Sequence, residues 1–247
     1  MEQGITQTID ILDDQNSNLF KVGVDFYLND KNTISVFTSQ NLFDGGTDGD
    51  TDILNPDPSI NQFQNINNKN DNTSAQYNFN YKLDFNKEGH NIELEADRNI
   101  FNGDSRTDNT FDGFFIRPNF FELTNTERNR TTINLDYVNP LTEKSKLELG
   151  LEARLFDNLI AYESDGRSQN DMGDYIPSTT LFDYKRHIYS AYITYSKQFE
   201  KWSYQFGVRA ETVDVETLAQ DTDLEANTVT QTPFNNNYSQ LYPSAFL

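Results

Sequence analysis

Apolar and polar residues alternate strictly over long stretches of this 247-residue chain. Residues 146–155 read KLELGLEARL and residues 202–211 read WSYQFGVRAE, so that every second side chain is apolar. A period of two over this length indicates a β-strand with one apolar and one polar face. The same period predicts eight strands and the start of a ninth near Tyr238; the eight are 20–29, 33–42, 73–86, 91–100, 129–138, 146–156, 186–199 and 202–216.

The connections between these strands alternate in length. Residues 29–32, 87–90, 139–145 and 200–201 form short turns, whereas 43–72, 101–128, 157–185 and 217–237 are long and hold most of the Asn, Asp, Gly and Pro. Short turns on one side and long loops on the other are typical of transmembrane β-barrels. The strand length agrees, because a tilted strand needs ~9–11 residues to span a bilayer.

The hairpin around Glu200–Lys201 predicts which side chains share a face. A two-residue turn pairs Phe199 with Trp202, and the ladder then pairs apolar with apolar and polar with polar residues. If the apolar face meets lipid, the lipid-facing residues include Ile193, Tyr195, Phe206 and Val208, and the lumen-facing residues include Thr194, Ser196, Gln205 and Arg209.

Alternation alone fits a soluble β-sandwich as well as a membrane barrel, because both have one apolar face per strand. Two further features favour the barrel. Charged residues such as Glu152 and Arg209 lie in mid-strand on the polar face, and aromatic residues gather near the short turns: Phe85, Tyr137, Phe199 and Trp202. Aromatic residues at this position are typical of the lipid–water boundary. We therefore expect an all-β, antiparallel, up-and-down barrel wall.

The composition excludes several classes of function. With 39 acidic and 19 basic residues, the net charge is −20, which disfavours nucleic-acid partners. Aromatic residues make up 13% of the chain, too many for simple disorder. The chain has no Cys and only two His, which excludes thiolate sites and multi-histidine metal centres. We expect no cofactor.

Candidate site residues are few. Asp48, Asp50 and Asp52 alternate like calcium ligands, but the Gly and Glu that an EF-hand loop requires are missing, so a solvated acidic loop is the simpler interpretation. Arg209 and Glu211, with Gln205 nearby, are lumen-facing candidates for a ligand contact or a structural ion pair. Neither a phosphate-binding loop nor a nucleophile elbow occurs in the sequence, so we expect no catalytic residues and no enzymatic activity.

The sequence resembles the β-barrel region of TonB-dependent outer-membrane receptors, in the form common in Bacteroidetes-type bacteria. The resemblance covers about residues 20–247 and rests on GVDFYLNDKNTISV (23–36), LDYVNPLTEKSKLELGLEAR (135–154), HIYSAYITYSKQF (187–199), GVRAE (207–211) and YSQLYPSAFL (238–247). Such receptors also carry an N-terminal plug and a segment that engages the energy-coupling protein. We find neither here, and a plugged transporter barrel has about 22 strands.

The resemblance therefore implies that residues 1–247 are a partial barrel domain, with 1–18 a loop or the end of a preceding strand. It implies an outer-membrane receptor of a Gram-negative bacterium that takes up a scarce nutrient: a metal chelate, a glycan piece or a peptide. Its partners would be outer-membrane lipid, the TonB complex through a plug absent from this chain, and a surface lipoprotein. The alternatives are a structural or biogenesis barrel without transport, and a secreted β-rich adhesin.

Overall fold

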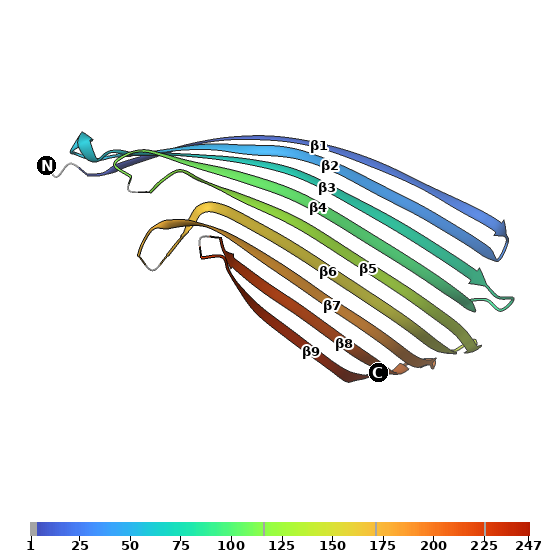
Figure 1. The fold of residues 1–247 in the computed structure, drawn as a ribbon. Helices are drawn as coiled ribbons and strands as arrows, with labels where there is room; N and C mark the ends of the chain where they lie inside the picture. The colour runs from blue at the N-terminus through green and yellow to red at the C-terminus, as the bar shows by residue number, and fades with distance from the viewer. Residues whose placement is uncertain (1–3, 116, 171, 225) are drawn as a thin grey trace.

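The computed structural model describes residues 4–115, 117–170, 172–224 and 226–247, which form one curved β-sheet (Figure 1). A short 3₁₀ helix, η1 (Pro58–Ile60), lies in one connection, and no helix of the described residues is long and apolar enough to cross a membrane. The strands are β1 (Thr6–Asn29), β2 (Asn32–Leu54), β3 (Gln62–Asp84), β4 (Asn91–Gly113), β5 (Phe120–Thr142), β6 (Ser145–Gln169), β7 (Tyr175–Gln198), β8 (Ser203–Asp223) and β9 (Thr228–Phe246).

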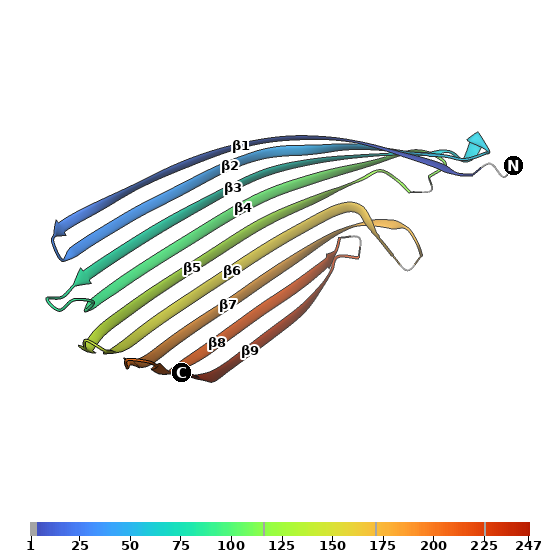
Figure 2. The same ribbon diagram turned by 180° about the vertical axis from the view of Figure 1, so that it is seen from behind.

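The nine strands follow one another across the sheet in sequence order, and every neighbouring pair is antiparallel. Figure 2 shows the same succession from behind, with β1 and β9 as the two edges. The predicted up-and-down, all-β architecture is confirmed, although the sheet is not closed into a barrel. The register predicted around Glu200–Lys201 is confirmed as well, because Ile193 pairs with Val208 and Tyr195 with Phe206.

The prediction of long loops is wrong, because most of those residues continue the strands. The connections beyond the predicted strands are only 55–61, 114–119, 170–174 and 224–227. Residues 6–18, expected to be a loop or the end of a preceding strand, belong to β1, and β9 begins well before Tyr238. The alternation disappears in these segments because polar side chains occupy both faces, while the backbone ladder continues regardless.

Two ends of the sheet are distinguished from here on. The turn end holds the tight connections 30–31, 85–90, 143–144 and 199–202, and the loop end holds the connections 55–61, 114–119, 170–174 and 224–227. Backbone hydrogen bonds close the tight connections: the Phe199 amide donates to the Trp202 carbonyl at 2.8 Å, and the Phe85 amide donates to the His90 carbonyl at 2.8 Å.

The sheet has two faces of opposite chemistry. We call the face that carries Ile193, Phe206 and Val208 the outer face, and the face that carries Arg209 and Glu211 the inner face. Near the turn end, the outer face is an apolar belt whose side chains are freely exposed: Phe206 is 55% and Leu151 56% exposed. The charged side chains of the inner face are less exposed, with Glu211 12% and Glu152 21% exposed. This is the reverse of the arrangement in a water-soluble domain.

Candidate functional site

Four charged residues of β6 and β8 form an ion-pair network on the inner face. Nε of Arg209 donates to Oε1 of Glu211 at 2.6 Å, and Nη2 of Arg209 lies 3.1 Å from Oε1 of Glu152. Arg154 contacts both carboxylates, at 3.1 Å in the case of Glu211. Ser190, on the strand between, accepts a hydrogen bond from Arg209 at 2.7 Å. Each charge thus has an opposite partner, as partly enclosed ions require.

The network contains two of the three lumen-facing residues predicted as candidate site residues. Arg209 and Glu211 are two residues apart on β8 and project from the same face, as the period of two requires. Gln205 lies on this face as well, but it pairs with Ser196 nearer the turn end and is not part of the network. Glu152 and Arg154 are far from Arg209 in the sequence, and no local pattern links them to it. The register of β6 with β7, which pairs Glu152 with Ser190, supplies that link.

A tyrosine extends this polar surface across two more strands. The hydroxyl of Tyr192 on β7 donates to Oδ1 of Asp136 on β5 at 2.5 Å, and its ring crosses the strand between at Gly150. A side chain at Gly150 would collide with that ring. Glycine therefore permits a hydrogen bond between strands that are not neighbours.

A hollow of about 550 Å³ opens on the same face, closer to the loop end. Its walls come from β1 to β6 and combine Arg128 and Arg130 with Phe101, Phe156 and a set of amide and hydroxyl side chains. No sequence pattern points to this hollow, because its residues are spread over more than 130 positions of the chain. Only the register of the whole sheet brings them together.

The predicted acidic triplet lies on the other side of the sheet. Asp48, Asp50 and Asp52 project from the outer face of β2, beyond the apolar belt, and the Asn65 amide donates to Asp48 at 2.7 Å and to Asp50 at 2.9 Å. Among the described residues, no group of three or more acidic or histidine side chains is placed to hold a metal ion. The triplet is thus part of an acidic surface, and a metal site there has no support from the geometry.

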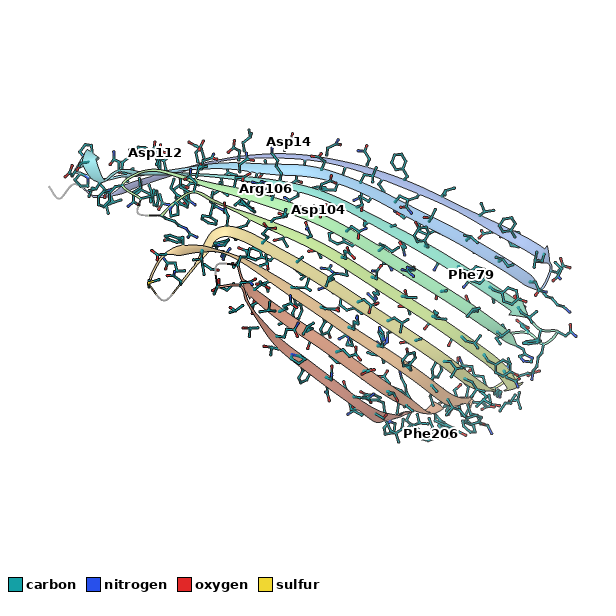
Figure 3. All side chains as sticks on the ribbon, viewed as in Figure 1. Asp14, Phe79, Asp104, Arg106, Asp112 and Phe206 are labelled. Atoms are coloured by element: carbon teal, nitrogen blue, oxygen red, sulfur yellow. The ribbon has the colours of Figure 1, made fainter. Side chains whose placement is uncertain are left out.

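The side chains of the outer face change from apolar near the turn end to polar and acidic nearer the loop end. Figure 3 shows Phe79 and Phe206 towards the turn end and Asp14, Asp104 and Asp112 towards the loop end. The change is abrupt: Asp44, Asp71 and Asp104 are direct cross-strand neighbours on β2, β3 and β4. Like charges opposite one another destabilise a sheet unless water screens them. The apolar belt therefore ends where the solvated part of the wall begins.

A brace of polar groups stabilises the loop end on the inner face. Glu122 on β5 accepts a hydrogen bond from the Tyr162 hydroxyl at 2.8 Å and pairs with Arg167. Ser164, fully buried, donates to the Phe121 carbonyl at 2.7 Å and accepts from the Arg167 amide at 3.1 Å. This arrangement fixes a bulge at 165–167, where the register of β6 with β7 shifts. Burial of the Glu122 carboxylate raises its pKa, but the hydrogen bonds from Arg167 and Tyr162 outweigh it and lower the pKa overall.

Aromatic side chains cluster on the outer face at the turn end. The rings of Phe199 and Trp202 stack with centroids 4.2 Å apart, and Tyr204 lies 5.8 Å from Trp202. Nζ of Lys197 lies 5.2 Å from the centre of the Phe199 ring. Aromatic rings beside a cation suit the boundary between lipid chains and headgroups. This cluster includes two of the four aromatic residues singled out in the sequence.

Comparison with known proteins gives a family match and two distant structural likenesses. Residues 83–247 match the model of a family described as the outer membrane protein beta-barrel family. No curated protein matches the sequence.

Among solved structures, the ferric yersiniabactin uptake receptor FyuA from Yersinia pestis is similar with a TM-score of 0.49 and 10% identity, over 97% of this chain. The chain spans 44% of that receptor. The outer membrane protease OmpT from Escherichia coli is similar with a TM-score of 0.30 and 10% identity, over 98% of this chain and 94% of OmpT.

Proposed function

Because the chain belongs to the outer membrane protein beta-barrel family and resides in the outer membrane, we propose that it is the wall of an energy-coupled uptake receptor for a scarce nutrient. The exposure pattern of the sheet is the observation that carries this proposal. Apolar side chains such as Phe206 stand free on the outer face, whereas charged side chains such as Glu211 are enclosed on the inner face. A lipid-contacting exterior around a polar lumen has this arrangement.

The two edges of the sheet support a barrel larger than nine strands. β1 and β9 are exposed along their whole length, and both run from the loop end towards the turn end. Pairing β9 directly with β1, in the same chain or in a second copy, would create a parallel seam. An odd number of further strands between them restores antiparallel pairing and an even total, as in bacterial barrels. Open edges do not occur in the hydrocarbon region, so such strands are required.

The inner face supports passage of a hydrophilic solute. Hydroxyl, amide and charged side chains predominate on it from the turn end to the loop end, with aromatic rings such as Phe101 and Phe156 among them, and ion pairs neutralise the most enclosed charges, such as Arg209. Among the residues that the structure describes, this surface offers binding groups without a nucleophile–base pair, which favours a transport role over a catalytic one.

Uptake by cells tests the proposal. The complete gene would be deleted, and accumulation of labelled metal chelates, glycan pieces and peptides would be compared with that of the parent strain. We expect the uptake of one solute class to be lost on deletion. The same uptake should be lost in the parent strain when an uncoupler dissipates the inner-membrane proton gradient. If every solute still enters and the cells instead become sensitive to detergent, the protein is a structural or biogenesis barrel.

A further inference from the structure

Four basic side chains, from β1, β5 and β7, share two adjacent rows of the inner face. One row crosses the sheet through directly paired residues: Lys21, Ser39, Gln76, Asn99, Arg130, Phe156, Arg186 and Val215. The next row towards the loop end runs through Leu19, Asn41, Ser74, Phe101, Arg128, Asn158, Tyr184 and Thr217. We call Lys21, Arg128, Arg130 and Arg186 the cationic band. Neither row contains an acidic residue.

The cationic band lacks the neutralisation found elsewhere on this face. Asp25, Glu95, Glu152 and Glu211 share a row about 13 Å closer to the turn end, at four residues of ~3.3 Å each. The intervening row holds Asp97, whose carboxylate accepts hydrogen bonds from the amides of Gln76, at 2.9 Å, and Asn99. Within the described part of the chain, no ion pair involves a member of the band. A chain with twice as many acidic as basic residues thus leaves its basic groups uncompensated here.

Arg128 and Arg130 of this band line the hollow of about 550 Å³. The guanidinium of Arg128 lies 5.5 Å from the centre of the Phe101 ring, and its Nε donates to Asn158 at 3.3 Å. Phe156 lines the hollow beside Arg130 and meets Tyr184 edge-on at 5.9 Å. Two guanidinium groups therefore border a surface that also presents aromatic rings.

The remaining wall supplies neutral hydrogen-bonding groups. Ser39, Asn41, Ser74, Gln76 and Asn99 line the hollow from β2, β3 and β4. Amide and hydroxyl side chains donate and accept, and so match the hydroxyl groups of a sugar. Arginine matches planar or tetrahedral anions through two parallel N–H donors.

We propose that this hollow binds an acidic sugar, whose carboxylate or sulfate groups meet Arg128 and Arg130 and whose ring lies against Phe101 and Phe156. The inference rests on the proposed uptake function and names the solute class. The outer face changes from the apolar belt to polar residues near Arg98, one position from Asn99, which shares the row of Arg130. In bacterial barrels the short turns face the periplasm, so the loop end faces outwards and an arriving solute meets this site before the acidic row.

Calorimetric titration of the complete protein in detergent micelles tests the site. The probes are tetragalacturonate, a chondroitin sulfate tetrasaccharide, the neutral maltotetraose and sodium sulfate. We expect both acidic tetrasaccharides to bind at least roughly tenfold more tightly than maltotetraose and sodium sulfate. Arg130→Gln and Arg128→Gln should each weaken the binding of the acidic probes by about tenfold or more. The loss of affinity should be larger at low ionic strength.

Arg98→Gln is the matched control, because it removes the same charge from the outer face, where Arg98 pairs with Thr131. Arg98 lies at nearly the same position along the strands as Arg130. Arg98→Gln should change binding by less than about twofold. Phe156→Leu is a second variant, which keeps both arginines. It should weaken the binding of the sugars and leave the binding of sulfate unchanged. Heat-modifiable gel mobility confirms folding of each variant.

The site is refuted if neither acidic probe binds, if maltotetraose binds equally well, or if Arg98→Gln is as damaging as Arg130→Gln. Sulfate binding as tight as that of the tetrasaccharides would refute the sugar assignment. Binding needs no energy source, so acidic-sugar binding in a protein that takes up no solute would contradict only the transport proposal. Uptake that is insensitive to Arg130→Gln would contradict only the site.

Discussion

Tyr192 lies across Gly150, with its ring in the space that a side chain at this position would fill and its hydroxyl 2.5 Å from Oδ1 of Asp136. The pairing joins β5 to β7 over the strand between them. Because the ring occupies the inner face, the sheet can curve towards that face without leaving a void above the glycine.

Gly150→Ala should destabilise the complete barrel by about 1–3 kcal/mol, because the new methyl group displaces the Tyr192 ring and breaks its hydrogen bond to Asp136. Urea titration of the protein in lipid vesicles, followed by gel mobility, measures the change. Gly49→Ala is the control, since its nearest neighbour would be the Ile66 carbonyl at an ordinary 3.8 Å. Equal stability of the two variants would contradict the close approach.

Ile193→Arg and Thr194→Arg place the same charge at the same height on opposite faces. Ile193 pairs with Val208 on the outer face, whereas Thr194 pairs with Gly207 on the inner face. An arginine facing lipid near mid-bilayer costs ~2–4 kcal/mol. We therefore expect Ile193→Arg to reduce the folded fraction strongly and Thr194→Arg to reduce it little, as measured by heat-modifiable mobility in vesicles. The reverse order would show that the faces are assigned wrongly.

The brace at Glu122 should make the loop end sensitive to acid. The pKa of the folded carboxylate lies below that of the unfolded chain, about 4.3, so the ionised group stabilises the fold above that pH. The stabilisation is lost as the pH falls through the folded-state pKa.

Amide hydrogen exchange across residues 120–126 and 162–168, at pH 6 and below pH 4, measures this effect. The exchange protection of the parent protein should decrease in acid beyond the intrinsic rate change, and Glu122→Gln should remove the decrease. A decrease of equal size in the variant would rule out Glu122 as its origin.

Trp202 is the single tryptophan of the chain and reports on the turn end directly. Stacked on Phe199 and 51% exposed on the outer face, it should lie at the boundary between headgroups and acyl chains. Phospholipids brominated near the headgroup should quench its fluorescence more than lipids brominated near the chain ends. Free access to aqueous acrylamide, without quenching by either lipid, would place this cluster outside the membrane.

The sequence by itself determined the strands of the apolar belt and their faces. In KLELGLEARL, and in the pair that joins Ile193 to Val208, the period of two excludes a one-residue slip, and the tight turn at Glu200–Lys201 then fixes the register of that pair. The sequence did not determine the length of the strands. Where water contacts both faces of a strand, as at 43–54, polar residues occupy both faces and the alternation is absent. Backbone hydrogen bonds continue the ladder there, and only the folded chain reveals them.

The inner-face sites depended on the tertiary structure. Arg209 and Glu211 are two residues apart, so a local rule sufficed to place them together. Lys21, Arg130 and Arg186 lie on β1, β5 and β7, and their shared row follows from the cumulative register of the pairs β1–β2 to β6–β7. A one-residue slip in any pair would move all later side chains to the opposite face. No local sequence pattern encodes this cumulative register, so the cationic band exists only in the assembled sheet.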